Sequence, residues 1–321
     1  MPTRPEAGCS ETLDARTAIR HYACMQTVRV FLFIALSCFT LHAQQIPAAI
    51  SADPPIDSKY QAAMDAFQLP SHGAQLNALT YIATGAGPHP VVVLLHGFPG
   101  NEKNLDLAQA VRRAGWDVLY FDYRGSWGSP GDFSFTHGTE DVAAALAYLR
   151  DPANATRLRA DPKRLVLIGH SMGGFMAGYG TAHDPALIGA AIISGADFGA
   201  HQYVTHPTVT EDQVVARLAP RLAEEGMAPL AGCTPEGLAK EVWINRADWD
   251  FAAFAPGLGK RPVLLVSSDD GLAPTAKVLA DELRKGGNTL VTEKHFTTDH
   301  SYSDHRIGLQ ATVLAWLATL P

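Results

Sequence analysis

The sequence has few cysteines and no concentration of positive charge. Only 4 of its 321 residues are cysteine, and Cys9, Cys24 and Cys38 lie near the N-terminus. If that segment is removed, Cys233 alone remains, which excludes an internal disulfide framework. Lysines and arginines are scattered and the formal net charge is −7, so nothing in the charge pattern indicates a surface for nucleic acid.

Apolar residues, in contrast, are plentiful. Hydrophobic residues make up 47% of the chain and charged residues 18%. A chain with this composition can bury a large core, and α/β domains often exceed about 200 residues. We therefore expect a globular protein with one main domain.

Residues 1–43 are predicted to be an N-terminal extension that contains a secretory signal peptide. Residues 28–41 are apolar with one charge, Arg29, near their start, and the small residue Ala43 follows. A basic start, an apolar run of about a dozen residues and a small residue at the cleavage point are typical of such a peptide. We expect cleavage after Ala43 and an exported protein, periplasmic or secreted, with no stable membrane insertion afterwards.

Three features of this segment stay open. Translation begins at either Met1 or Met25, because the signal-peptide pattern starts well at Met25. Residues 35–38 can also be interpreted as a poor lipoprotein box in which Cys38 carries the lipid. A retained membrane anchor is the third alternative, although the apolar run is short for a bilayer span.

After a proline-containing lead-in over residues 44–65, the pattern predicts one α/β domain over residues 66–321. Short apolar runs that alternate with amphipathic segments indicate a mostly parallel, doubly wound sheet with helices on both faces. Strands are expected at 75–84, 91–95, 118–121, 165–168, 190–194, 263–266 and near 289–295. Helices are expected at 105–114, 139–150, after the glycine-rich turn to about 182, and at 276–285 and 308–320.

One segment, at about 198–259, interrupts this alternation. It has helical stretches and the aromatic residues Trp243, Trp249, Phe251 and Phe254. We interpret it as a helical cap insertion that covers the functional site rather than as a separate folding unit.

The most specific motif is G-x-S-x-G at residues 169–173, which follows a buried strand and precedes a helix. A sharp strand-to-helix turn of this kind exposes the serine hydroxyl above the sheet and leaves little room beside it, which explains Gly169 and Gly173. The helix N-terminus also favours negative charge that develops there. The motif therefore predicts that Ser171 is a nucleophile.

A second motif, H-G-x-x-G at residues 96–100, leaves the strand predicted at 91–95. A turn in this place can direct a backbone amide toward the nucleophile. We therefore expect the amides of Phe98 and Met172 to form an oxyanion hole, and His96 to be a hydrogen-bonded brace rather than a catalyst.

A serine nucleophile needs an imidazole base, and the imidazole needs a carboxylate that orients it. The expected chain order is serine, acid, histidine. Asp270, just after the strand at 263–266, is the preferred acid, ahead of Asp269 and of Asp197. His300, in the loop before the last helix, is the preferred base.

Two further histidines flank His300. His305 is the alternative base, and His295 is expected to belong to the last strand. The steps of five residues between these histidines match no recognised zinc spacing. We therefore expect neither a metal nor a cofactor.

These motifs resemble the α/β-hydrolase superfamily over about residues 70–320. Residues 121–129, Phe-Asp-Tyr-Arg-Gly-Ser-Trp-Gly-Ser, further resemble a loop of dipeptidyl- and acylaminoacyl-peptidase-like hydrolases. The resemblance implies acyl-transfer chemistry but no particular substrate. A serine at position 171 argues against dehalogenase or epoxide hydrolase chemistry, and we expect no propeller domain before the hydrolase segment.

The predicted activity is hydrolysis of carboxylic esters through an acyl-enzyme on Ser171. A small aminopeptidase or amidase is the alternative, and it needs a carboxylate that pairs with a peptide amine. Four acids of the insertion are candidates for that carboxylate: Glu211, Glu224, Glu225 and Glu241. A non-catalytic binding module is a third possibility. The expected partner is a small ester or a short peptide.

Overall fold

The computed structural model describes residues 46–199 and 208–321. The chain divides into two compact units, Met1–Ile46 and Pro47–Pro321, and the description below concerns the second. The predicted signal peptide, its cleavage site and three of the cysteines lie outside the described residues. Among the described residues, no helix is both long and apolar enough to cross a membrane.

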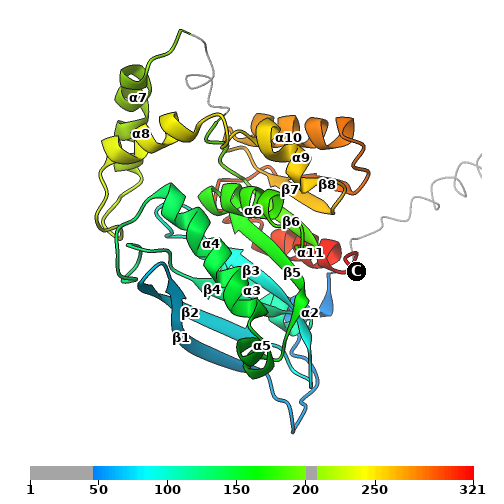
Figure 1. The fold of residues 1–321 in the computed structure, drawn as a ribbon. Helices are drawn as coiled ribbons and strands as arrows, with labels where there is room; N and C mark the ends of the chain where they lie inside the picture. The colour runs from blue at the N-terminus through cyan, green and yellow to red at the C-terminus, as the bar shows by residue number, and fades with distance from the viewer. Residues whose placement is uncertain (1–45, 200–207) are drawn as a thin grey trace, which may run out of the picture. The chain divides into compact units, whose positions relative to one another are not determined.

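An eight-stranded sheet forms the centre of this unit (Figure 1). Its strands lie in the order β1-β2-β4-β3-β5-β6-β7-β8. Their bounds are β1 Ala63–Ser71, β2 Ala74–Ile82, β3 His89–Leu95, β4 Asp117–Phe121, β5 Ala160–His170, β6 Gly189–Ile193, β7 Val263–Ser267 and β8 Val291–His295. The pairs β1–β2 and β2–β4 are antiparallel, and every other pair is parallel. The mostly parallel sheet confirms the predicted α/β fold class.

Helices cover both faces of the sheet. Their bounds are α2 Ala48–Ser51, α3 Leu105–Arg113, α4 Phe135–Arg150, α5 Pro152–Leu158, α6 Met172–His183, α7 Glu211–Glu224, α8 Pro235–Asn245, α9 Phe251–Leu258, α10 Ala273–Lys285 and α11 Arg306–Leu317. Alternate side chains of a strand point to opposite faces. Val91 and Val93 of β3 accordingly join the core cluster with α4, α6 and α9, whereas Val92 and Leu94 join the cluster with α3 and α11.

Helix α4 begins earlier than the sequence predicts. The expected start was Thr139, because two acids follow it as in a first helical turn. The structure instead places Ser134 at the N-cap, where its side chain accepts a hydrogen bond from the amide of His137. The acid at position 141 is buried inside the fold and bonded to Arg124, so it does not serve the helix end.

The insertion predicted at 198–259 divides between two environments. Helices α7 and α8 pack on each other and project beyond the sheet layers (Figure 1), but inner side chains of both, such as Leu222 and Leu238, join the main core cluster. Helix α9 packs against α6 and α10, and Trp249, Phe251 and Phe254 belong to the main core. Trp243 lies instead beside Val214 of α7 in a small separate cluster. The part that stands over the domain is therefore α7, α8 and their loops.

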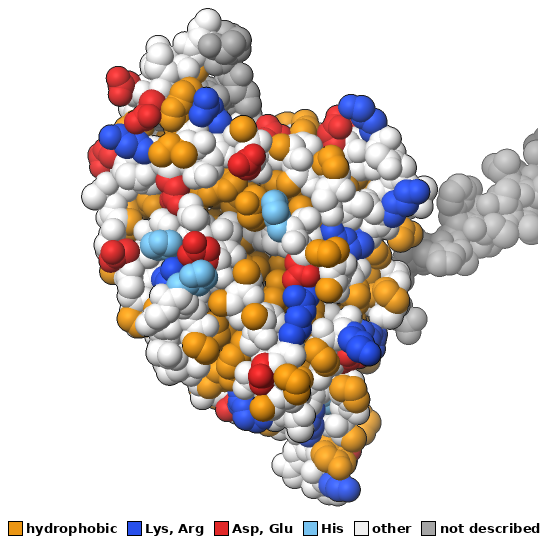
Figure 2. Space-filling model, viewed as in Figure 1, with side chains coloured by type: hydrophobic (Ala, Val, Ile, Leu, Met, Phe, Trp, Pro, Cys, Tyr) orange, Lys and Arg blue, Asp and Glu red, His pale blue; other side chains and the backbone are white. Residues whose placement is uncertain are grey.

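Charged side chains of both signs are interspersed over the face seen in Figure 2. This face carries no extended region of one sign, in agreement with the scattered charges of the sequence.

Candidate active site

Ser171 occupies a strained turn between β5 and α6. Its φ is 59° and its ψ is −122°, a conformation that L-residues rarely adopt outside functional sites. A Cβ at Gly169 would lie 1.8 Å from the carbonyl oxygen of Gly173, and a Cβ at Gly173 would lie 2.1 Å from that of Leu95. Only glycine fits at either position, so the motif spacing is a packing requirement of the turn.

The acid and the base that were preferred from the sequence lie together. Nδ1 of His300 is 2.8 Å from Oδ2 of Asp270. Asp270 follows β7, and His300 lies in the loop between β8 and α11. The chain order places both loops at the carboxyl edge of the parallel strands, where Ser171 also lies.

The alternative acids and bases have other partners. Asp269 pairs with His295, with 3.0 Å between Oδ1 and Nε2, on the exposed surface. Asp197 accepts hydrogen bonds from the amides of Gly199 and Phe251. His305 pairs with the adjacent Asp304.

A group of buried hydroxyls supports Asp270. The Ser194 hydroxyl lies 2.8 Å from the Tyr302 hydroxyl and 3.2 Å from that of Ser268. Burial raises the pKa of Asp270, but hydrogen bonds from His300, from the hydroxyls of Ser194 and Ser268 and from the Leu272 amide outweigh it. The pKa of Asp270 is held well below its ordinary value, so the carboxylate stays ionised.

His300 has a second neighbour that the sequence analysis did not single out. Nε2 of His170 lies 2.8 Å from the backbone oxygen of His300, and the two rings are 4.6 Å apart. Burial lowers the pKa of His170 to about 4, so the ring is neutral near pH 7 and donates through Nε2–H. The sequence signal that could have identified His170 was its position next to Ser171 in the G-x-S-x-G motif.

The segment 96–100 lies directly beside the nucleophile. A Cβ at Gly97 would be 3.0 Å from Cβ of Ser171. His96 is buried, and its Nδ1 donates to the Gly97 carbonyl at 2.7 Å. Burial lowers the pKa of His96 to about 4, so this neutral ring braces the loop, as expected.

A cavity of about 140 Å³ contains both Ser171 and His300. The rest of its lining is Gly97, Phe98, Pro99, Gly100, Asn101, Glu102, His170, Glu225 and Ser301. Glu102 accepts a hydrogen bond from the amide of Asn104, at 2.6 Å. Glu225 comes from the C-terminal end of α7, so the insertion contributes directly to this cavity.

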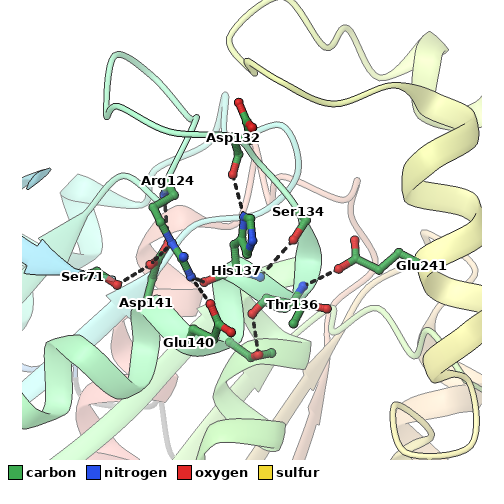
Figure 3. A network of polar contacts seen from close by, with 10 residues as sticks. Ser71, Arg124, Asp132, Ser134, Thr136, His137, Glu140, Asp141 and Glu241 are labelled. Atoms are coloured by element: carbon green, nitrogen blue, oxygen red, sulfur yellow. Dashed lines mark hydrogen bonds and ion pairs between the residues drawn. The ribbon is translucent and has the colours of Figure 1, made fainter. Parts of the chain in front are cut away.

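Another of the candidate acids, Glu241, has a different role (Figure 3). Its carboxylate accepts hydrogen bonds from the amides of Phe135 and Thr136, at 2.9 and 2.7 Å. Since these amides belong to the first turn of α4, Glu241 connects α8 to the α/β layers.

The same view shows how the loop after β4 is held. Arg124 lies between Glu140 and the buried Asp141, with 2.7 Å from its Nε to Oδ1 of Asp141 (Figure 3). Ser71 of β1 donates to the same carboxylate oxygen, at 2.6 Å. Asp141 therefore connects β1, the loop after β4 and α4.

The described ranges, 46–199 and 208–321, offer no site for a metal ion. They contain no group of three or more histidine, cysteine or acidic side chains that could hold a metal ion.

Comparison with known proteins identifies the class as α/β-hydrolase. Residues 86–247 match the sequence model of the family described as "Serine aminopeptidase, S33". The match spans half of the chain, and the protein belongs to this family of hydrolases.

Individual relatives are more distant. An uncharacterized protein of Mycobacterium tuberculosis is 30% identical over 154 residues, which are 47% of this chain and 53% of the relative. The sn-1-specific diacylglycerol lipase ABHD11 of Xenopus tropicalis is 30% identical over 172 residues, 49% of this chain and 50% of the relative. The chain thus spans about half the length of these relatives.

Solved structures share the fold. An esterase of Pyrobaculum calidifontis has a TM-score of 0.58 at 17% identity, with 82% of this chain and 85% of the esterase covered. The acylaminoacyl peptidase of Pyrococcus horikoshii has the same score and identity, with 80% and 41% covered. At these identities the likeness concerns the fold alone.

Proposed function

We propose that the protein cleaves carboxylic esters through an acyl-enzyme intermediate, with Ser171, His300 and Asp270 as catalytic triad. The observation that carries the proposal is the 2.8 Å contact between His300 and Asp270, with His300 in the same cavity as Ser171. The strained φ of Ser171 adds support, because such strain concentrates at functional sites.

The reaction begins when the Ser171 hydroxyl attacks the ester carbonyl and His300 takes its proton. The ionised Asp270 accepts a hydrogen bond from Nδ1–H of His300, which selects the required tautomer and stabilises the imidazolium that forms. The amides of Phe98 and Met172 stabilise the oxyanion. His300 then protonates the leaving alcohol and activates the water that hydrolyses the acyl-enzyme.

Esters with a short acyl chain are the proposed substrates. The cavity of about 140 Å³ is small beside ligand pockets, which commonly measure about 300–1,000 Å³. A chain of many carbons would have to extend out of it. The name of the Xenopus relative, a diacylglycerol lipase, and the esterases among the solved structures are compatible with ester cleavage.

An aminopeptidase is the second candidate. Glu225 lines the cavity and is the one of the four candidate acids that does so among the described residues. A carboxylate in this place suits the protonated amine of a short peptide, and the description of the family names such an activity.

The test is hydrolysis of p-nitrophenyl esters from acetate to decanoate beside alanyl- and prolyl-p-nitroanilide. We expect the acetate or butyrate ester to be cleaved fastest, and Ser171→Ala to reduce turnover by orders of magnitude. Full activity in Ser171→Ala would overturn the triad. Turnover of the anilides alone, lost in Glu225→Gln, would establish the aminopeptidase instead.

We also propose export through the N-terminal segment with cleavage after Ala43. The support is the sequence pattern of residues 28–43. A mass spectrum of the mature protein that begins at Gln44 is the expected result, and one that begins before residue 30 would contradict it.

A further inference from the structure

Trp127 touches three segments that meet beside the proposed oxyanion hole. It lies in the loop after β4, and its φ is 49°. A bulky residue in this left-handed region is uncommon and is maintained only where surrounding contacts compensate the strain. The half-buried side chain does not line the cavity, so any effect on the reaction must pass through its neighbours.

The first contact is with the segment that carries Phe98. The indole Nε1–H of Trp127 donates a hydrogen bond to the Pro99 carbonyl, at 2.8 Å. A Cβ at Gly100 would lie 2.4 Å from Nδ1 of His96 and 2.8 Å from Nε1 of Trp127. The chain at residues 99–100 therefore passes between two rings that leave it little freedom.

The second contact fixes the indole itself. The Lys103 ammonium lies 4.4 Å from the centroid of the Trp127 ring, a cation–π distance. The same ammonium is 3.0 Å from Oδ1 of Asp122, which also accepts the Tyr120 hydroxyl at 2.6 Å. The ring is thus held in place by a charge that is itself anchored at the end of β4.

The third contact is with the loop between α7 and α8, which is part of the insertion. The Trp127 amide donates to the Pro229 carbonyl at 2.9 Å, and Ser126 forms a β-bridge with Leu230. The Ala231 amide donates to the Gly125 carbonyl at 2.7 Å. The insertion also supplies Glu225 to the cavity. Trp127 therefore connects the position of the insertion to the position of residues 97–100.

We infer that Trp127 is a positioning residue for the proposed oxyanion hole, which it holds through the indole hydrogen bond to Pro99 and couples to the insertion through its backbone. The inference rests on the proposed function. Because the oxyanion forms only as the reaction proceeds, a misplaced Phe98 amide should reduce kcat and leave KM nearly unchanged.

The test uses Trp127→Phe, which keeps an aromatic ring over Lys103 but removes the indole N–H. The matched control is Trp243→Phe, whose ring contacts Arg246 in the insertion and does not line the cavity. We expect kcat for p-nitrophenyl acetate to fall about tenfold to a hundredfold in Trp127→Phe, since small misplacements at a reacting centre have effects of this order. The control should retain the wild-type kcat.

Two measurements separate this role from a general loss of structure. Active-site titration with a fluorophosphonate counts the competent molecules, and its amplitude should equal that of wild type. Phenylboronic acid forms a B–O bond to the serine hydroxyl and becomes a tetrahedral anion, while the proton passes to His300. Its dissociation constant should rise in Trp127→Phe by the same factor as kcat falls.

The contrary outcomes are also distinct. A Trp127→Phe protein with wild-type kcat and boronate affinity, or one whose lost activity equals its lost titration amplitude, would overturn the inference. A wild-type protein that neither reacts with the fluorophosphonate nor binds the boronate would overturn the proposed function and this inference with it.

Discussion

His170 donates a hydrogen bond from Nε2 to the backbone oxygen of His300, across 2.8 Å, and the two rings pack 4.6 Å apart. The residue before the proposed nucleophile therefore holds the backbone of the proposed base. Because burial keeps His170 neutral above a pKa of about 4, this contact persists across the working range of a serine hydrolase.

His170→Ala should accordingly lower kcat for p-nitrophenyl acetate by about tenfold or more, because His300 would lose part of its orientation. KM should change little. The exposed His183, which bonds to the Tyr179 carbonyl, provides the control variant His183→Ala with wild-type kinetics. A His170→Ala protein as active as the control would show that the His300 loop holds its position without this bond.

The buried hydroxyls of Ser194, Ser268 and Tyr302 near Asp270 lead to a second prediction. In Ser194→Ala the Asp270 carboxylate loses a donor and the buried Tyr302 hydroxyl loses its 2.8 Å partner. The Tyr302 hydroxyl keeps its hydrogen bond with Ser268, so the cost is that of the lost bonds, each worth about 0.5–1.5 kcal/mol, and the free energy of unfolding should fall by that order. Urea unfolding with wild type and Ser194→Ala measures the difference.

The same substitution should change the titration profile of Asp270, which NMR of its carboxyl carbon measures. Removal of a hydrogen bond to the charged form raises the pKa of Asp270, so this carboxyl group should titrate at a higher pH in the variant than in wild type. Exposed Ser58→Ala, in the segment before β1, is the control. Coincident profiles for Ser194→Ala and wild type would show that the Ser194 hydroxyl does not stabilise the carboxylate.

These supporting residues mark the limit of what the sequence could predict. The strands β3, β5, β6 and β7 were expected because a continuous apolar run is typical of a strand that is buried on both faces. The turn at Ser171 was expected because its two glycines meet local packing needs. Both signals lie within about ten consecutive residues.

Signals that depend on distant partners were not available in the same way. Ser194, Ser268 and Tyr302 are brought together only by the sheet order, and nothing local in the chain pairs them. Ser194 and Ser268 do follow β6 and β7 directly, so their place at the carboxyl edge of the sheet was a usable hint. The start of α4 was misplaced for a related reason, since Asp141 bonds to Arg124 of another loop.

Asp117, the first residue of β4, should make the stability of the protein depend on pH. The side chain is fully buried, Oδ1 accepts the Ala83 amide at 2.8 Å, and Oδ2 has no hydrogen-bond partner among the described residues. Burial raises the pKa of Asp117 from 3.8 to about 7. Between these two values the folded state holds a proton that the unfolded state has released, so this group makes stability fall as pH rises.

Asp117→Asn should therefore be more stable than wild type at pH 8 and equally stable at pH 4. A pKa difference of this size corresponds to at most about 4 kcal/mol. Urea unfolding at both pH values measures it, with the exposed Asp53→Asn as the control for removal of a charge. A stability difference of the same size at pH 4 and pH 8 would contradict the assignment.

Glu241 should hold the insertion to the α/β layers through the first turn of α4. Its carboxylate accepts the amides of Phe135 and Thr136, which have no acceptor inside the helix. Glu241→Ala leaves both amides without this partner, and exchange of their hydrogens with solvent should become faster by about tenfold or more, as expected for a lost bond of about 1.5 kcal/mol. Lys240→Ala, exposed on the same helix, should exchange like wild type. Unchanged protection of Phe135 and Thr136 in Glu241→Ala would show that this carboxylate does not hold α8 to the first turn of α4.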